Sequence, residues 1–206
     1  SADLTIAMGL YSRCILGLRL TPGSTKSIDV AGVLMEALQP FDTPTDWGTS
    51  ARWPYHGLPD TLLVDPTRTK VSRFTRAGIL PETLVVDHGA AYLSEHLTSG
   101  CARLGISIQP ARIYQPTDKS PVERFFRTLD DLLQELPGYK GADVAGRGED
   151  PEAEAVYTVP QLEQIIREWV ATVYHLRPHS SLEDPNLPGV KLSPAQRYEQ
   201  GLAVAG

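Results

Sequence analysis

The chain has 206 residues, 41% of them hydrophobic, which is typical of a globular protein with one sizeable core. Its 19 basic and 25 acidic residues give a formal net charge of −6 at pH 7. This charge argues against a protein whose whole surface binds nucleic acid through phosphate contacts, although it is compatible with a local basic patch. No stretch approaches the roughly 20 continuous apolar residues of a membrane span, and the start lacks a secretory signal, so we expect a cytoplasmic protein.

The two cysteines, Cys14 and Cys101, are too few for a disulfide framework or a zinc site, and we expect both to be reduced thiols in the core. The chain starts with Ser1 and Ala2 rather than with an initiator methionine. We therefore expect a piece of a longer protein.

Two apolar runs open the chain and predict an antiparallel hairpin, LTIAMGLYS and CILGLRLTP. Apolar residues at helical spacing then predict a helix within residues 24–38, with a cap at Ser24 or Ser27. Residues 39–59, with four prolines and two tryptophans, predict a long loop or insertion.

The middle of the chain predicts two short buried strands that end in Asp65 and Asp87, DTLLVDP and ETLVVDHG. A helix capped by Ser94 and stopped by Gly105 is expected next, and SIQPAR predicts a brief strand. Strands and helices therefore alternate after the hairpin, which indicates an α/β fold with a mixed sheet covered by helices.

The stretch QPTDKSPVERFFRTL predicts a helix that begins at Pro121. Its apolar face is expected to hold Val122, Phe125, Phe126, Leu129, Leu132, Leu133 and Leu136, and its polar face Glu123, Arg127, Asp130 and Gln134. Residues 138–157, rich in Gly, Ala and acidic residues, predict a mobile loop. PQLEQIIREWVATVYHL predicts a last strong helix, and the tail from Arg177 is expected to be an extended arm.

Two acidic residues are candidates for chemistry, and each has a second interpretation. Asp87 follows a Leu-Val-Val run at the carboxyl end of a strand, where open α/β sheets bind ligands. Taken alone, it is more typical of a turn aspartate that binds its own backbone, because Asp-x-Gly turns are common. Asp65 has the same two interpretations, and the proline after it favours the turn. Glu123 stands three residues after Ser120, which predicts a capping box as the alternative to chemistry.

Asp87 and Glu123 are separated by the 35 residues from 88 to 122, and Arg-Phe-Phe-Arg follows Glu123. With LVVDHGAAYLSEHL around Asp87 and DKSPVERFFRTL around Glu123, the chain resembles the catalytic core of the DDE transposases and retroviral integrases, whose fold is ribonuclease H-like. It is most similar to bacterial insertion-element and bacteriophage Mu type transposases. Further matching segments are LTIAMGLYSRCILGLRL, ARLGISIQP, WVATVYHLRPHSSL and LSPAQRYEQG.

The resemblance implies metal-dependent DNA cleavage and strand transfer, with three carboxylates that hold two Mg²⁺ or Mn²⁺ ions. Asp87 and Glu123 would be the second and third of these ligands. The implied partners are DNA, as transposon ends and target, and further copies of the chain, with no membrane and no small-molecule cofactor. On this basis residues 1–137 form a truncated catalytic core, 138–157 a mobile acidic and glycine-rich loop, and 158–206 a C-terminal helix and extended tail of the same core.

The first acid of the family precedes the hairpin, so we expect this fragment to lack the first strand that carries it. Asp3 is the acidic residue near the start and is considered only as a substitute, and Gly9 stands where relatives often carry an aspartate. Two carboxylates would under-coordinate a metal pair, so the fragment is expected to bind metal weakly and to be inactive in strand transfer. Its uncovered sheet edge would invite pairing with a second copy.

Secondary candidates for contacts to DNA phosphates are Lys119, Arg124, Arg127 and His88. The alternatives are a solvated helix face for the three basic residues, an ion pair between Glu123 and Arg127, and a turn histidine at position 88. Arg177 and His179 are expected to fix the tail against the core. We expect Glu123 to cap the helix without metal and to bind metal in the DNA complex.

Two other functions fit the same sequence. One is a non-catalytic ribonuclease H-like scaffold module of a transposition complex. The other is a nuclease that cuts DNA without joining strands.

Overall fold

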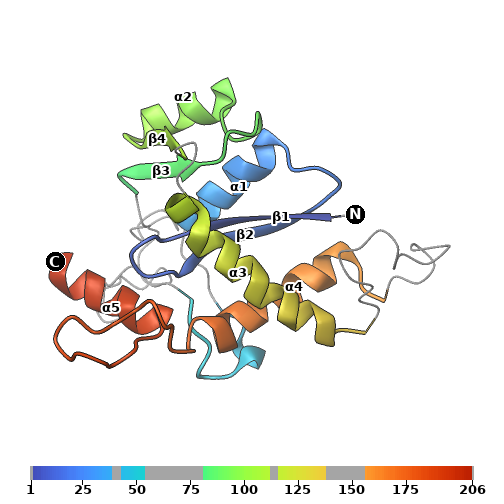
Figure 1. The fold of residues 1–206 in the computed structure, drawn as a ribbon. Helices are drawn as coiled ribbons and strands as arrows, with labels where there is room; N and C mark the ends of the chain where they lie inside the picture. The colour runs from blue at the N-terminus through green and yellow to red at the C-terminus, as the bar shows by residue number, and fades with distance from the viewer. Residues whose placement is uncertain (1, 39–42, 54–80, 112–115, 138–155, 206) are drawn as a thin grey trace, which may run out of the picture.

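The computed structural model describes residues 2–38, 43–53, 81–111, 116–137 and 156–205 (Figure 1). The predicted strand that ends in Asp65 lies outside these residues, as does nearly all of the predicted loop over 138–157. Within the described residues, no helix has both the length and the apolar character needed to cross a membrane.

The predicted hairpin is confirmed. Strand β1, Ala2–Met8, pairs antiparallel with β2, Ile15–Pro22, and the register shifts after Ala7. Helix α1, Ser27–Leu38, follows as predicted and packs on β2. A Cβ at Gly17 of β2 would lie 2.4 Å from a backbone oxygen of α1, so only glycine allows the helix to approach so closely.

The start of α1 is capped differently from the prediction. Asp29, in the first turn, accepts a hydrogen bond from the backbone N–H of Lys26 at 2.9 Å. The predicted caps, Ser24 and Ser27, do not make this contact. A carboxylate in the first turn also interacts favourably with the positive end of the helix dipole.

The second strand pair is parallel. β3, Thr83–Val86, pairs with β4, Ser107–Pro110, and α2, Glu95–Arg103, connects them. Ser94 caps α2 and Gly105 follows it with a φ of 73°, both as predicted. The α/β class is confirmed, and the described strands form two separate pairs rather than one continuous mixed sheet.

Helix α3, Pro116–Glu135, begins about one turn earlier than the sequence predicted. Ser120 and Pro121 therefore lie inside the helix, and the predicted capping box between Ser120 and Glu123 is wrong. The helix still starts at a proline, Pro116. The first backbone N–H groups of a helix have no intrahelical partner, so proline, which has no backbone N–H, is well tolerated there.

The predicted faces of α3 are confirmed. Phe125 and Leu129 are buried, and the exposed residues include the polar set predicted above. Phe125 packs edge-on against Tyr174, with ring centroids 5.0 Å apart. These contacts fix the side of α3 that faces the core and so fix the direction of its polar face.

The C-terminal part differs from the prediction in one respect. α4, Val159–Trp169, continues into the π-helical turn η5, Val170–Tyr174, so the predicted last strong helix is present. The tail is not an extended arm throughout, because it ends in a further helix, α5, Pro194–Ala205. At its start, the side chains of Ser193 and Gln196 each bind the other's backbone N–H, which is a capping box.

The predicted loop over 39–59 is partly built into the core. It contains the short 3₁₀ helix η1, Thr45–Trp47, and both of its tryptophans, Trp47 and Trp53, are buried. Arg52 donates its backbone N–H to the carbonyl of Ala171 at 2.8 Å. The described part of this segment is therefore a packed element of the fold.

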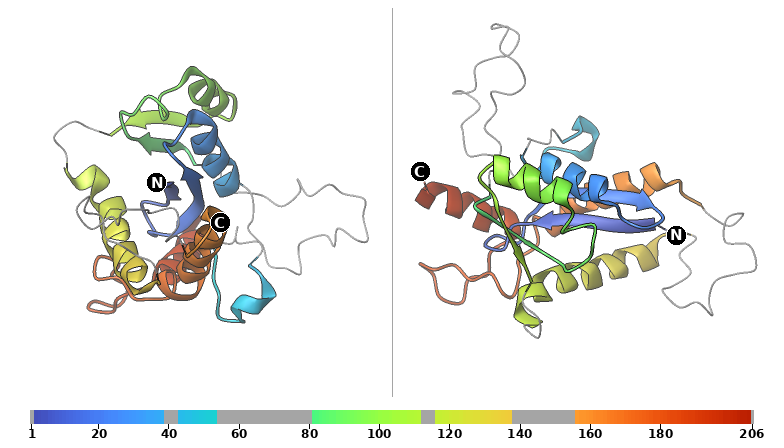
Figure 2. Two further views of the ribbon diagram at one scale, coloured as in Figure 1. Left: turned by 90° about the vertical axis from the view of Figure 1, so that its right-hand side faces the viewer. Right: turned by 90° about the horizontal axis from the view of Figure 1, so that it is seen from above.

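Two hydrophobic clusters hold the layers together. The larger joins the hairpin, α3, α4 and η5, and the smaller joins α1 and α2. Figure 2 shows α1 and α3 on opposite sides of the β1–β2 hairpin. Cys14 and Cys101 are buried free thiols, as predicted, and burial raises the pKa of Cys14 to about 12.

Candidate functional site

A cavity of about 990 Å³ lies between the two strand pairs. Five consecutive residues of β1, from Leu4 to Met8, and all four residues of β3 line it. Since successive side chains of a strand point to opposite faces, continuous runs of lining residues indicate that strand edges border the cavity. Residues of α1 form one side and residues of α3 and α5 the other, and the lining is mainly apolar.

Two carboxylates line this cavity among the described residues, Asp87 and Glu123. Both were predicted as site residues from positions far apart in the sequence. Asp87 directly follows the last residue of β3, whose strand lines the cavity. Glu123 lies on the polar face of α3, which points away from the buried Phe125. The structure therefore brings the two predicted acids to one cavity.

Asp87 also forms the turn contact that was its alternative interpretation. Its Oδ1 accepts a hydrogen bond from the backbone N–H of His88 at 2.7 Å. The Asp87 side chain is exposed to solvent. The turn contact and a ligand contact are compatible, since an ionised carboxylate has about four acceptor positions.

The secondary candidates are placed as follows. Arg124 donates from Nε and Nη2 to the carbonyl and hydroxyl of Ser120, at 3.3 and 3.2 Å. Arg127 is exposed, and it forms no ion pair with Glu123, so the predicted pair is wrong. His88 is exposed in the turn after β3, and the side chain of Lys119 lies outside the described part of the structure.

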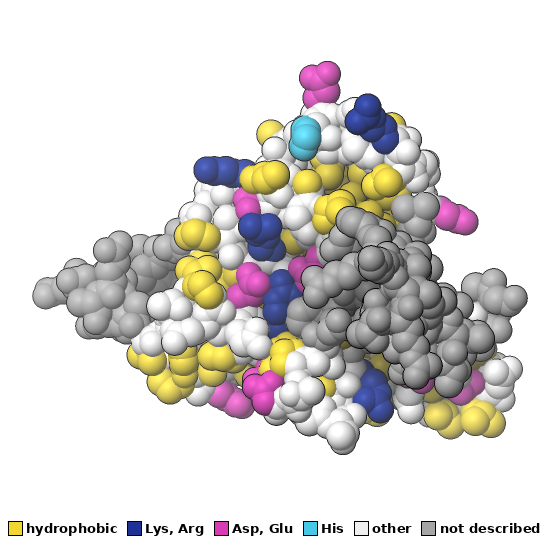
Figure 3. All heavy atoms as spheres, turned by 180° about the vertical axis from the view of Figure 1, so that it is seen from behind, with side chains coloured by type: hydrophobic (Ala, Val, Ile, Leu, Met, Phe, Trp, Pro, Cys, Tyr) yellow, Lys and Arg dark blue, Asp and Glu magenta, His cyan; other side chains and the backbone are white. Residues whose placement is uncertain are grey.

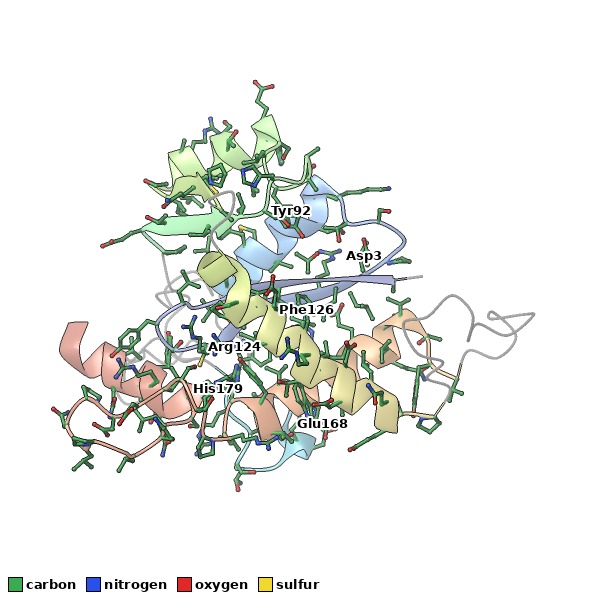
Figure 4. All side chains as sticks on the ribbon, viewed as in Figure 1. Asp3, Tyr92, Arg124, Phe126, Glu168 and His179 are labelled. Atoms are coloured by element: carbon green, nitrogen blue, oxygen red, sulfur yellow. The ribbon has the colours of Figure 1, made fainter. Side chains whose placement is uncertain are left out.

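Asp3 is not among the residues that line the cavity. Its Oδ2 accepts a hydrogen bond from the backbone N–H of Thr25 at 3.0 Å. Figure 4 shows Asp3 at the start of β1, away from Arg124. The side chain therefore fastens the end of the hairpin to the segment before α1.

Sequence reasoning missed the part that the C-terminus plays at this site. Tyr198, Gly201 and Leu202 of α5 line the cavity, and a Cβ at Gly201 would lie 2.8 Å from the ring of Tyr11 in the hairpin turn. The Arg197 guanidinium lies 4.2 Å from the centre of the same ring. The capping-box sequence Ser-Pro-Ala-Gln was the signal that could have revealed α5.

Sequence reasoning also missed a basic residue, Arg13. It lies in the hairpin turn next to residues 9–12, which line the cavity. Its pKa is lowered by burial and by the charge of Arg124. The pKa of His179 is lowered by burial and by the charges of Arg124, Arg13 and Arg177.

The donor chemistry of the site suits a hard divalent cation, because both acids offer carboxylate oxygens. Within the ranges that the structure describes, no three His, Cys, Asp or Glu side chains are grouped closely enough to hold a metal ion. Asp87 and Glu123 thus provide a pair of ligands rather than a complete set.

Comparisons with known proteins show a similarity to transposases. The family model for the TnsB C-terminal domain matches residues 72–138, about a third of the chain, and this range contains both Asp87 and Glu123. The transposase for transposon Tn552 from Staphylococcus aureus is 26% identical over 138 residues, which cover 66% of this chain and 22% of that protein. The predicted resemblance to transposases is confirmed. This transposase-like chain spans about a fifth of the length of that curated relative.

Two solved structures are also similar to the transposase-like chain. The catalytic core domain of BIV integrase aligns with a TM-score of 0.49 and 14% identity, over 99% of this chain and 90% of the other. A chain of the simian T-cell lymphotropic virus intasome in complex with PP2A regulatory subunit B56 gamma aligns with a TM-score of 0.43 and 16% identity, over 96% of this chain and 52% of the other.

Proposed function

We propose that the chain is the catalytic core fragment of a DDE transposase, which cuts DNA and transfers strands in a metal-dependent reaction. The observation that carries this proposal is the placement of Asp87 and Glu123 on one cavity. The match to a transposase over two thirds of the chain supports it. The proposed substrate is DNA, both as transposon end and as target, and the active complex is expected to contain several copies.

Asp87 and Glu123 are the residues that would hold Mg²⁺ or Mn²⁺. A bound divalent ion would supply Lewis-acid stabilisation of charge on the phosphate and on the reacting oxygens. The protein's own contribution is positioning. The buried face of α3 holds Glu123 in place, and the turn after β3 holds Asp87 through its contact with the His88 amide.

The first carboxylate of the family would come from a strand that precedes the hairpin. The cavity has the shape that such a strand needs, because the edges of β1 and β3 border it and α1 and α3 cover its sides. A strand there would pair with both edges and could bring its acid beside Asp87. We therefore expect the 206-residue fragment alone to bind metal weakly and to be inactive in strand transfer. A cytoplasmic location stays a prediction.

The test uses the intact reading frame in a strand-transfer assay with a labelled DNA end. We expect joining of the DNA end to target with Mg²⁺ and none with a chelator. Asp87→Asn and Glu123→Gln should each reduce the rate by at least about 100-fold, since the metal contributes several kcal/mol to the barrier. Glu95→Gln, at an exposed carboxylate in the first turn of α2, is the matched control and should keep normal activity.

Equal activity in Asp87→Asn and the intact protein would overturn the assignment of the site. Cleavage without joining would instead identify a nuclease.

A specific observation favours a second candidate, the non-catalytic scaffold. The Asp87 carboxylate already has a structural partner in its own turn, which is enough to explain an aspartate at this position. A scaffold would show neither cleavage nor joining in the same assay, and the intact frame would carry no aspartate on an apolar strand before the hairpin.

A further inference from the structure

Four basic residues from separate parts of the chain act on one another electrostatically: Arg13, Arg124, Arg177 and His179. Arg13 comes from the hairpin turn, Arg124 from α3, and the other two from the segment after η5. They lie within electrostatic reach of one another, because three of these residues lower the pKa of the fourth, His179, in addition to its burial. Figure 4 shows Arg124 and His179 close together at the turn end of the hairpin.

The backbone of Arg13 is held in an unusual conformation. It is the non-glycine residue with positive φ among the described residues, at 65°. This region is unfavourable for a residue with a Cβ, because the Cβ comes close to the following carbonyl oxygen. Its N–H donates to the carbonyl of Gly9 at 2.7 Å, and the hydroxyl of Tyr174 donates to its carbonyl at 3.1 Å. The fold thus fixes an arginine at a position where asparagine or glycine would be less strained.

The other members are also held in place. The Arg124 guanidinium is anchored to Ser120 through two of its five N–H donors, which leaves donors on the same planar group for a further partner. The ring of His179 packs edge-on against Tyr174, with centroids 6.0 Å apart. The backbone N–H of His179 donates to the carbonyl of Leu192 at 2.9 Å. Preorganised donors of this kind lose less entropy when they bind a ligand.

The cluster places positive charge around His179. Each charged group that shifts the pKa of His179 is an arginine. On the opposite face of the molecule, basic and acidic side chains lie next to one another (Figure 3). A concentration of positive charge in a chain with a net charge of −6 indicates a site for an anion.

The cluster is also next to the candidate site. Leu10, Tyr11 and Ser12, which precede Arg13, line the cavity, and so do Val122 and Glu123, which precede Arg124. An anion held by the cluster would therefore lie at the side of the cavity where Glu123 is placed.

We propose that Arg13, Arg124, Arg177 and His179 bind backbone phosphates of a DNA strand and position a phosphodiester beside Asp87 and Glu123. This inference rests on the proposed function and adds positioning residues to it. The planar guanidinium of arginine matches a phosphate through two parallel hydrogen bonds. Phosphate contacts fix the register of a nucleic acid on a protein without reading its sequence.

The test measures binding of the 206-residue chain to a short labelled DNA duplex by fluorescence anisotropy, in EDTA and over a range of salt. The double variant Arg124→Gln, Arg177→Gln should weaken binding about 10-fold or more at low salt and should reduce the slope of log K against log salt by about 2. Arg124→Lys keeps the charge and should retain most of the affinity. The matched control is Arg103→Gln, at an exposed arginine in the last turn of α2.

Three outcomes would overturn the inference. One is an equal loss of affinity in Arg103→Gln and the double variant, and another is an unchanged salt slope. The third is tighter binding of an RNA duplex of the same sequence, which would assign the cluster to RNA. Thermal unfolding checks that the variants are folded, and Arg177→Gln alone, at an exposed side chain, stands in if Arg124→Gln unfolds. These results need no metal and no strand transfer, so they can fail while the proposed function stands.

Discussion

The two edges of the β1–β2 hairpin differ in what covers them. At the outer edge of β2, the backbone N–H groups of Leu18 and Leu20 donate to the carboxylates of Glu36 and Glu163, at 3.4 and 2.8 Å. The guanidinium of Arg167 donates to the carbonyl of Leu18 and pairs with both glutamates. Side chains from α1 and α4 therefore take the place of a further strand at this edge.

His175 continues the covered edge at the start of β2. Its Nε2 accepts a hydrogen bond from the backbone N–H of Ile15 at 3.0 Å, and its Nδ1 lies 2.7 Å from the carbonyl of Arg52. Because Nε2 must accept, the proton is on Nδ1, which donates to Arg52. The His175 carbonyl accepts from the N–H of Ala195 in α5 at 3.0 Å. One buried residue thus joins the hairpin, the tryptophan segment and the C-terminal helix.

The edge of β1 has no such cover from described side chains and borders the cavity instead. Backbone groups at the β2 edge are therefore hydrogen-bonded by side chains, whereas the β1 edge borders the cavity that Asp87 and Glu123 also line. Exposed strand edges tend to pair with further strands. Experiments that disturb one edge at a time can test this contrast.

The largest effect is expected from Arg167→Leu, which removes the centre of the covered edge. It removes the cation that pairs with two partly buried glutamates and the donor to the Leu18 carbonyl, so the free energy of unfolding should fall by about 2–4 kcal/mol. The matched control is Arg19→Leu, because Arg19 is half exposed, its pair with Asp29 is long at 3.6 Å, and Asp29 keeps its hydrogen bond from the Lys26 N–H. That variant should lose less than about 1 kcal/mol. Urea unfolding measures both, and equal losses would contradict the contrast.

A smaller effect is expected from acid. Burial lowers the pKa of His175 from its ordinary value of 6.5 to about 4. The unfolded chain therefore binds a proton that the folded chain refuses, so stability is fully present above pH 6.5 and is lost as the pH falls from 6.5 toward 4. Between pH 6.5 and pH 5 the loss should be about 2 kcal/mol.

His175→Phe supplies the control for this pH effect. It keeps a ring of similar size but leaves the Ile15 N–H and the Arg52 carbonyl unpaired, so at pH 7.5 it should cost about 1–3 kcal/mol. Its stability should then vary much less between pH 6.5 and pH 5 than that of the unchanged chain. Parallel curves for the two proteins in urea unfolding would show that another group is responsible.

The smallest effect is expected at the open side. Val85 in β3 is 37% exposed and lines the cavity. Val85→Thr keeps a β-branched shape and should change the stability of the 206-residue chain by no more than about 0.5 kcal/mol. In a longer protein with a strand in the cavity the cost should be larger, because the hydroxyl would then be buried. Thermal unfolding of both lengths makes the comparison, and a loss of several kcal/mol in the short chain would show that this side is already closed.

Three short sequences show how well a capping-box pattern predicts the start of a helix. Thr-Val-Pro-Gln at 158–161 and Ser-Pro-Ala-Gln at 193–196 both form capping boxes at helix starts. Ser-Pro-Val-Glu at 120–123 has the same pattern but lies inside α3. The local chemistry is equivalent in all three, so the pattern alone could not show that the helix extends to Pro116.

The candidate site was predictable only in part. The interval between Asp87 and Glu123 and the residues around them predicted the pair, because the family resemblance depends on sequence motifs and their spacing. The basic cluster was not predictable as a unit, since its members come from three segments and meet only after folding. Arg13 in particular carries no local signal beyond its place in a turn.

Local patterns were enough to predict five features: the hairpin, the helix after it, the Ser94 cap with its Gly105 stop, the apolar face of α3 and the two buried thiols. Each follows from side chains that are neighbours along the chain. The three-dimensional fold was needed to show that Trp47 and Trp53 belong to the core. It was also needed to show that His175 and Arg167 complete one edge of the hairpin while a cavity borders the other. The physical reason is that burial and hydrogen bonding of a backbone edge depend on residues far away in sequence, and their proximity is a product of the whole fold.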